Sequence, residues 1–219
     1  MVVRENFEKD LQELKEQMIE MSELTISALE KAFTALQTQD VELALEVIDE
    51  DAEIDQFDTD IDQFIVWLIA KEQPVARDLR RIIGALKITS EIERIADFAV
   101  NIAKGTIRIG KTASLLEITH LERMKDISIE MLKKAMDAFF VEVMSLAREV
   151  EKLDDQVDSS SDATTKLIME YMRDHPEETP QMIQLLLINR HIERTADHIT
   201  NIAESAAYLI KGRKYDLNT

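Results

Sequence analysis

A 13-residue segment occurs twice in this chain, 100 positions apart. Residues 91–103 read EIERIADFAVNIA and residues 191–203 read HIERTADHITNIA, so eight of the thirteen positions are identical. In both copies a glutamate, an aspartate and an asparagine follow at intervals of four, which places them along one side of a helix. The repeat therefore indicates two similar helical units, each with the same polar ridge.

A second match extends the duplication. Residues 28–55 align without a gap onto residues 131–158, and the identical positions include Asp51 with Asp154 and Asp55 with Asp158. A period of about 100 residues is much longer than the repeat of a solenoid. We therefore expect two tandem domains, residues 1–111 and 112–219.

The spacing of apolar side chains predicts three helices in each unit. Apolar residues recur at intervals of three and four over residues 6–38, and a second helix is expected from about Gln39-Asp40 to Lys71. Pro74 suits the first turn of a third helix that ends near Gly105 or Gly110. In the second unit the same spacing predicts helices over 115–141, over 142–174 and from the break at 176–180 to about Lys211. Thr112 or Ser114 is the expected cap of the first of these helices, near the joint between the two units.

These helices define the expected fold class. With only 4 Gly and 3 Pro in 219 residues the chain has few turns, which favours long helices over many short strands. Short connections make neighbouring helices antiparallel. We expect an all-α protein of two tandem three-helix bundles, with six long helices and a pseudo-twofold internal repeat.

Charge and composition exclude several classes of function. The net charge of −18 argues against binding to nucleic acid or to anionic lipid, because both surfaces repel the chain. The absence of cysteine excludes disulfides, thiol nucleophiles and thiolate metal sites. The longest apolar run, residues 64–70, is far shorter than a membrane span, and the N-terminus has no signal-peptide pattern. We expect a cytoplasmic protein that reaches a membrane only through partner proteins.

Acidic side chains lie at the edge of the apolar face on two helices of each unit. In a hairpin that turns near residues 71–74, Asp55 and Glu93 lie at similar distances from the turn, and so do Asp51 and Asp97. These four carboxylates are therefore expected to converge. The second unit has the same acids on its second and third helices: Asp154, Asp158, Glu193 and Asp197. Like charges at such proximity repel strongly and require a compensating cation.

Three interpretations of these ridges remain open. The acids face water, or basic side chains such as Arg94 and Arg190 neutralise them, or they bind metal. Oxygen ligands alone suit Mg²⁺, Mn²⁺, iron or Ca²⁺. His191 and His198 would favour zinc or iron as ligands, but the first unit has Glu91 and Phe98 at these positions, which favours surface residues.

No sequence signature of catalysis is present. The glycines are isolated, so there is no nucleotide-binding loop of the Walker or Rossmann kind, and no Gly-x-Ser-x-Gly elbow occurs. We therefore expect a protein that is not an enzyme. A metal-dependent hydrolase or oxidase of a carboxylate-bundle type, and a metal-free helical adaptor, are the alternatives.

Three segments resemble the PhoU family of phosphate-uptake regulators. They are QPVARDLR at residues 73–80, with ERIADFAVNIA from Glu93, and the second copy ERTADHITNIA from Glu193. The resemblance extends over essentially the whole chain and implies two three-helix bundles that frequently form homodimers. The second half reads PEETPQM at 176–182 in place of PVARDLR, so the two halves are expected to differ in occupancy or partner use.

The resemblance also implies a function and a set of ligands. Family members are cytoplasmic accessory proteins that repress phosphate-starvation signalling and restrain phosphate uptake, and their partners are the phosphate ABC transporter ATPase and a phosphate-sensing histidine kinase. Some members bind metal clusters, so Mg, Mn, Fe or Zn is expected here. By position the ligands are Asp51, Asp55, Glu93, Asp97, Asp154, Asp158, Glu193 and Asp197, with Asn101, Asn201 and His198 as additional candidates.

Overall fold

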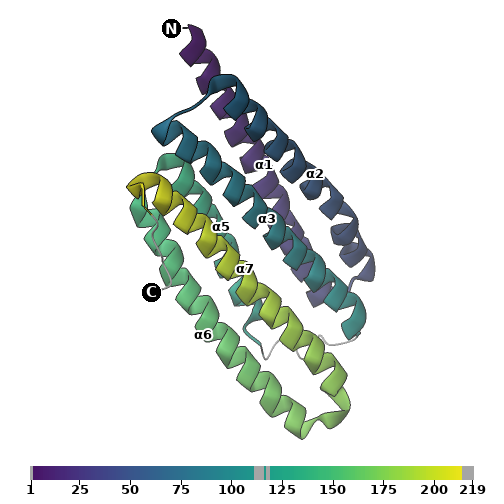
Figure 1. Ribbon diagram of the computed structural model, residues 1–219. Coiled ribbons are helices and arrows are strands. Elements are labelled where there is room, and N and C mark those ends of the chain that lie inside the picture. Colours follow the sequence, from purple (N-terminus) through teal and green to yellow (C-terminus); the bar gives the residue numbers. More distant parts are fainter. Residues whose placement is uncertain (1, 111–115, 117–118, 214–219) are drawn as a thin grey trace.

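The chain folds into long helices that run nearly parallel or antiparallel to one another (Figure 1). The computed structural model describes residues 2–110, 116 and 119–213. The elements are α1 (Val2–Thr38), α2 (Val41–Glu72), α3 (Ala76–Ile109), α5 (Leu121–Val141), α6 (Met144–Asp174), the 3₁₀ turn η1 (Pro176–Glu178) and α7 (Thr179–Lys211). The described residues form no strand, which confirms the predicted all-α class. The expected caps Thr112 and Ser114 lie outside the described residues.

Local chemistry ends α2 close to its predicted boundary, whereas α5 begins at Leu121 and not near residue 115 as expected. The Asp40 side chain accepts a hydrogen bond of 3.0 Å from the Leu43 backbone N–H, which caps α2. Gln73, in the left-handed conformation, ends α2. Pro74 does not occupy the first turn of α3 as expected, since α3 begins at Ala76 after the extended residue Val75. A proline disfavours helical geometry in the residue before it, which makes Pro74 a terminator of α2 here.

Two three-helix bundles form, as predicted. Helices α1, α2 and α3 pack together, and so do α5, α6 and α7. The bundles join where α3 lies beside α7 along the middle of the molecule, with α2 and α6 on opposite outer sides (Figure 1). We call this α3–α7 contact the seam.

Equivalent helices run antiparallel across the seam. Glu91 of α3 meets His198 of α7, whereas Gly105, further along α3, meets Ile188, earlier in α7. A twofold axis perpendicular to both helices produces this arrangement. Gly105 permits the close approach, because a Cβ on it would lie 3.1 Å from the Ile188 side chain.

Buried apolar side chains and lysine–glutamate pairs between helices stabilise the bundles. The predicted apolar stripe of α3 is buried, from Ala85 to Ile102. Lys31 of α1 pairs with Glu50 of α2, and the equivalent Lys134 of α5 pairs with Glu149 of α6. A lysine–glutamate contact thus joins the first and second helices of each bundle.

Candidate functional site

The α2–α3 hairpin brings acids of the two helices together in the first repeat. Burial raises the pKa of Asp51 to about 6, Asp55 and Asp97 add to that rise, and Lys104 opposes it. Burial likewise raises the pKa of Glu93, with further increases from Asp97 and Asp55. We call Asp51, Asp55, Glu93 and Asp97 the first acidic cluster. Its members lie within electrostatic range of one another across the hairpin.

Asp58 extends this cluster towards the α2–α3 turn. Burial raises its pKa, and the neighbouring carboxylates of Asp62 and Asp55 raise it further. Asp58 also raises the pKa of Glu93, which shows that it faces α3. The column of acids in the first repeat is therefore longer than the four residues predicted as ligands.

The α6–α7 hairpin forms the second acidic cluster, which consists of Asp154, Asp158, Glu193 and Asp197. Asp154 is only 6% exposed, and burial raises its pKa to about 7, aided by Asp158 and Asp197. Burial and the charges of Asp197 and Glu193 raise the pKa of Asp158 as well. Burial is the main reason that Asp154 holds its proton up to near-neutral pH, and the neighbouring carboxylates add to it.

Basic side chains neutralise these clusters only in part. Arg94 lies 3.3 Å from Asp97 and 3.6 Å from Glu93, and Arg190 contacts Glu193. These arginine side chains are 59% and 62% exposed, so water screens much of their effect. In the described residues no ion pair reaches the α2 and α6 members of the clusters.

Buried carboxylate oxygen atoms are the feature of the clusters that bears on cation binding, although neither cluster places three ligand atoms within 4.8 Å of one another. Oδ1 of Asp58 is buried and has no hydrogen-bond partner among the described residues. A hydrogen bond from the Thr200 hydroxyl lowers the pKa of Asp154, so this side chain has a polar neighbour in α7. Buried polar atoms are normally satisfied, and carboxylate oxygens are the ligands that Mg²⁺, Mn²⁺ and Ca²⁺ prefer.

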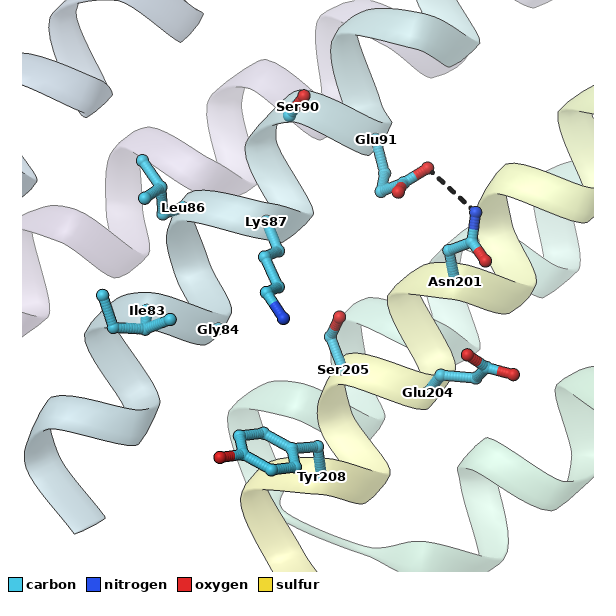
Figure 2. A pocket seen from close by; sticks show the side chains of 10 residues that line it. All are labelled: Ile83, Gly84, Leu86, Lys87, Ser90, Glu91, Asn201, Glu204, Ser205 and Tyr208. Carbon is cyan, nitrogen blue, oxygen red and sulfur yellow. Dashed lines mark hydrogen bonds between the residues drawn. The ribbon is translucent and has the colours of Figure 1, made fainter. Parts of the chain in front are cut away.

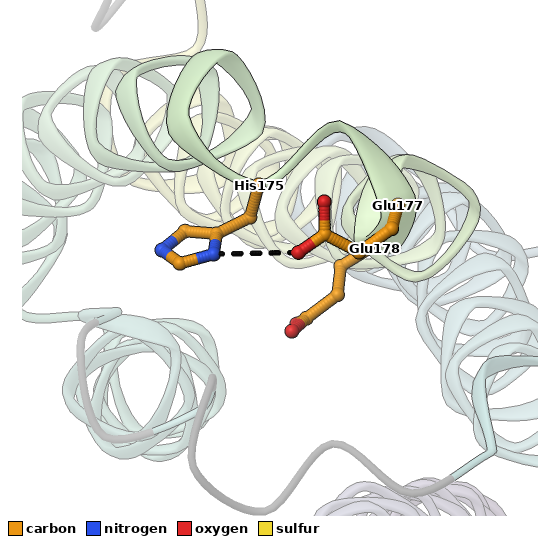
Figure 3. A group of neighbouring side chains, drawn as sticks. All are labelled: His175, Glu177 and Glu178. Atoms are coloured by element: carbon orange, nitrogen blue, oxygen red, sulfur yellow. Dashed lines mark ion pairs between the residues drawn. The ribbon is translucent and has the colours of Figure 1, made fainter.

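One tighter group of donors was not predicted from the sequence. In the described part of the chain, only His175, Glu177 and Glu178 each place one ligand atom within 4.8 Å of the others (Figure 3). They lie in the turn between α6 and α7, where the His175 ring stacks on Tyr171 with centroids 4.2 Å apart. The H-x-E-E spacing of residues 175–178 is the sequence signal that could have indicated this group. The His175 and Glu177 side chains are 44% and 69% exposed.

The two histidines of the repeated segment lie in the seam, so the interpretation as surface residues is wrong. Nδ1 of His198 is 2.6 Å from Oε2 of Glu91, and Asn201 donates to the same oxygen at 3.2 Å. The Phe98 ring lies between His191 and His198, with centroid distances of 5.8 and 5.4 Å. His198 and Asn201 thus contact α3, whereas the second acidic cluster spans α6 and α7. Asn101, the remaining additional candidate, is half-buried one turn beyond Asp97.

A groove of about 700 Å³ opens along the seam, away from both acidic clusters. Lys87, Ser205 and Tyr208 line it, and the Glu91–Asn201 hydrogen bond closes one end (Figure 2). Its mixture of acidic, basic and hydroxyl groups selects no single class of ligand.

Comparison with known proteins agrees with this architecture. The PhoU domain model matches residues 18–106 and 121–206, one match in each bundle. The chain is 35% identical over 155 residues to the phosphate-specific transport system accessory protein PhoU homolog of Clostridium acetobutylicum, an alignment that spans 70% of this chain and 71% of the relative.

Solved structures show the same fold over nearly the whole chain. The phosphate transport system regulatory protein PhoU from Streptococcus pneumoniae superimposes with a TM-score of 0.88 at 32% identity, covering 96% of this chain and 99% of that one. PhoU from Pseudomonas aeruginosa gives a TM-score of 0.86 at 28% identity, covering 94% and 100%. Within the described ranges, no helix combines the length and hydropathy that crossing a bilayer requires. Two family domains, one in each of two equivalent bundles, establish that the chain belongs to the PhoU family.

Proposed function

We propose that this chain is a cytoplasmic regulator of phosphate transport that acts by protein contact rather than by catalysis. The names of its relatives, a phosphate-specific transport system accessory protein and a phosphate transport system regulatory protein, support the link to phosphate transport. The partners that we propose are the ATPase of the phosphate ABC transporter and a phosphate-sensing histidine kinase. Binding to both would hold the kinase in its phosphate-replete output and restrain uptake.

The proposal includes cation binding at both acidic clusters. The observation that supports it is the burial of Asp154, which is 6% exposed and lies beside Asp158 and Asp197, so that burial and these two charges raise the pKa of this side chain to about 7. When bound, a divalent or trivalent ion such as Mg, Mn, Fe or Zn supplies the missing positive charge. The carboxylates of α2 with α3, and of α6 with α7, would hold such ions and thereby stabilise each hairpin.

Cation binding and partner binding are linked through the surface. The net charge of −18 gives the chain long-range attraction for basic protein patches. Cations in the clusters would keep both hairpins rigid, and a rigid surface binds with less loss of conformational entropy. We further propose that the functional form is a homodimer.

A pull-down experiment tests this function. The chain is immobilised and exposed to the transporter ATPase and to the cytoplasmic part of the kinase, with Mn²⁺ or with EDTA. Retention of both partners supports the proposal, and weaker retention of D97N/D197N shows that the clusters contribute. The matched control is D49N, which removes one exposed charge from α2. Failure to retain either partner under both conditions refutes the proposed function.

A further inference from the structure

The α2–α3 and α6–α7 hairpins share one face of the molecule. Helix α1 packs against both α2 and α3, α5 packs against both α6 and α7, and α1 contacts α5. Because α1 and α5 lie together on one side, the other sides of the two hairpins form the opposite side of the molecule (Figure 1). We call this opposite side the hairpin face. The twofold axis perpendicular to α3 and α7 passes through it, so each position on one hairpin has an equivalent on the other.

Each hairpin carries apolar side chains on this face between its acidic cluster and its turn. Val66 of α2 is 67% exposed, and the equivalent Met169 of α6 is 62% exposed. On the neighbouring helices, Ile83 of α3 is half-buried and the equivalent Ile183 of α7 is exposed. We call these four side chains the tip residues. They form two apolar contact surfaces, one on each hairpin.

A buried polar network holds the tip residues of the second hairpin side by side. Nδ2 of Asn189 donates to the Ser161 hydroxyl at 2.9 Å and to the Thr165 hydroxyl at 3.1 Å. These bonds fix the register of α6 against α7. In an antiparallel hairpin with this register, Met169 and Ile183 lie next to each other one turn nearer the connection between the helices.

Neighbouring exposed positions differ between the two hairpins, whereas the tip residues are apolar in both. Trp67 of α2 corresponds to the charged Glu170 of α6, and Ala70 corresponds to Arg173, at positions that are exposed in both repeats. Exposed positions that contact only water tolerate such exchanges at little cost. Apolar side chains that are exposed at equivalent places in both repeats therefore indicate a contact that both hairpins make.

An exposed carboxylate accompanies the tip residues of each hairpin at the same spacing. Asp55 precedes Val66 by eleven residues, Asp158 precedes Met169 by eleven residues, and both aspartates are exposed. Eleven residues make three helical turns, so each aspartate lies on the same side of its helix as the tip residue, about 16 Å away. This pair of contacts is complementary to a partner segment that carries an apolar side chain and a lysine or arginine.

We propose that the hairpin face binds a twofold-symmetric protein dimer, each protomer of which places the same basic, amphipathic segment on one hairpin. The inference rests on the proposed function and assigns the surface and the symmetry of its partner contact. The partner's own axis relates its two segments as the pseudo-twofold axis of this chain relates the two hairpins. Two contacts on one chain also reinforce each other, because the second forms within an assembled complex. The stoichiometry is one chain for every two copies of the partner.

Stoichiometry and tip variants test this inference, with the transporter ATPase and the cytoplasmic part of the kinase as probes. Sedimentation velocity gives the mass of each complex, and we expect one chain for every two copies of the partner. V66E and M169E each place a carboxylate on the apolar contact of one hairpin. We expect each to weaken binding at least about tenfold and V66E/M169E to abolish it. Circular dichroism confirms that the variants retain their helices.

L45E is the matched control, because Leu45 is also an exposed apolar residue of α2 but lies near the opposite end of that helix. We expect it to bind both probes as the wild type does. Equal binding by V66E/M169E and the wild type, or a complex with one partner copy per chain, would overturn the inference and leave the proposed function intact. A loss of self-association in V66E/M169E without any partner would overturn it too, because the hairpin face would then join two copies of this chain. If neither probe binds the wild type, the proposed function fails together with the inference.

Discussion

His198 of α7 places its Nδ1 2.6 Å from Oε2 of Glu91 in α3, so the two repeats are joined by a polar contact across the seam. The side chains are only 22% and 25% exposed. The Phe98 ring packs against His198 on the same surface. The repeated segment thus has two faces, one that contributes acids to its own hairpin and one that joins the bundles.

Removal of the seam contact should weaken the protein. His198→Ala should lower the free energy of unfolding by about 1 kcal/mol, because Glu91 loses a partner in a part-buried position. Urea unfolding measures the change. His175→Ala is the control, since that side chain is 44% exposed in the α6–α7 turn. An equal effect of the two substitutions would show that the seam contact contributes nothing.

The metal-free protein should become less stable as the pH rises from 4 to 8. In the folded state burial raises the pKa of Asp51 to about 6 and that of Asp154 to about 7, both above the ordinary aspartate value of 3.8. Well below the unfolded pKa of 3.8 both groups are protonated in the folded and the unfolded protein, whereas above their folded pKa the folded state contains buried charges. Stability is therefore lost through this window. Unfolding midpoints in EDTA at pH 5 and pH 8 measure it, and a higher midpoint at pH 8 contradicts the expectation.

Asp154→Asn should stabilise the metal-free protein at pH 8. The substitution removes a buried charge while keeping the shape of the side chain, and we expect a gain on the order of 2 kcal/mol. Its pH dependence should also be flatter than that of the wild type. Asp49→Asn, on the exposed side of α2, serves as the control and should change stability by less than about 0.5 kcal/mol. A destabilising effect of Asp154→Asn in EDTA would contradict the account of Asp154 as a buried, unfavourable charge.

Packing of α3 against α5 requires glycine at position 84. A Cβ on Gly84 would lie 2.9 Å from the ring of Phe139, so Gly84→Val should cost about 1–3 kcal/mol. Ser90→Val places the same side chain on an exposed position of α3 and controls for helix propensity. Thermal unfolding of the two variants separates crowding from propensity. Equal midpoints would mean that the bundle relaxes around the added side chain.

The helices were predictable because their causes are local. A strict spacing of apolar residues, Asp40 as a cap and the scarcity of glycine each act within a few residues along the chain. The predicted start of α3 at Pro74 was wrong by two residues, since α3 begins at Ala76. Proline suits the first turn of a helix, but it also disfavours helical geometry in the preceding residue, and here that second effect ends α2 at Gln73. The acidic ridges were also predictable from the sequence, because an i, i+4 spacing puts side chains on one face of a helix and a short turn determines which two helices pair.

The seam and the Asn189 network were not predictable in the same way. Which face of α7 packs against α3 depends on contacts between residues about 100 positions apart, so His191 and His198 seemed to be surface residues. Asn189 carries no charge and belongs to none of the motifs found in the sequence. Its role depends on Ser161 and Thr165, which reach it only after α6 and α7 have packed together.

Calorimetric titration with Mn²⁺ tests the central claim, that the two acidic clusters bind cations, most directly. Wild-type protein freed of metal is compared with D51N/D97N/D154N/D197N, in which each cluster loses two charges but keeps its shape. The account predicts saturable Mn²⁺ binding by the wild type and its loss in the quadruple variant. Identical isotherms for the two proteins would contradict it.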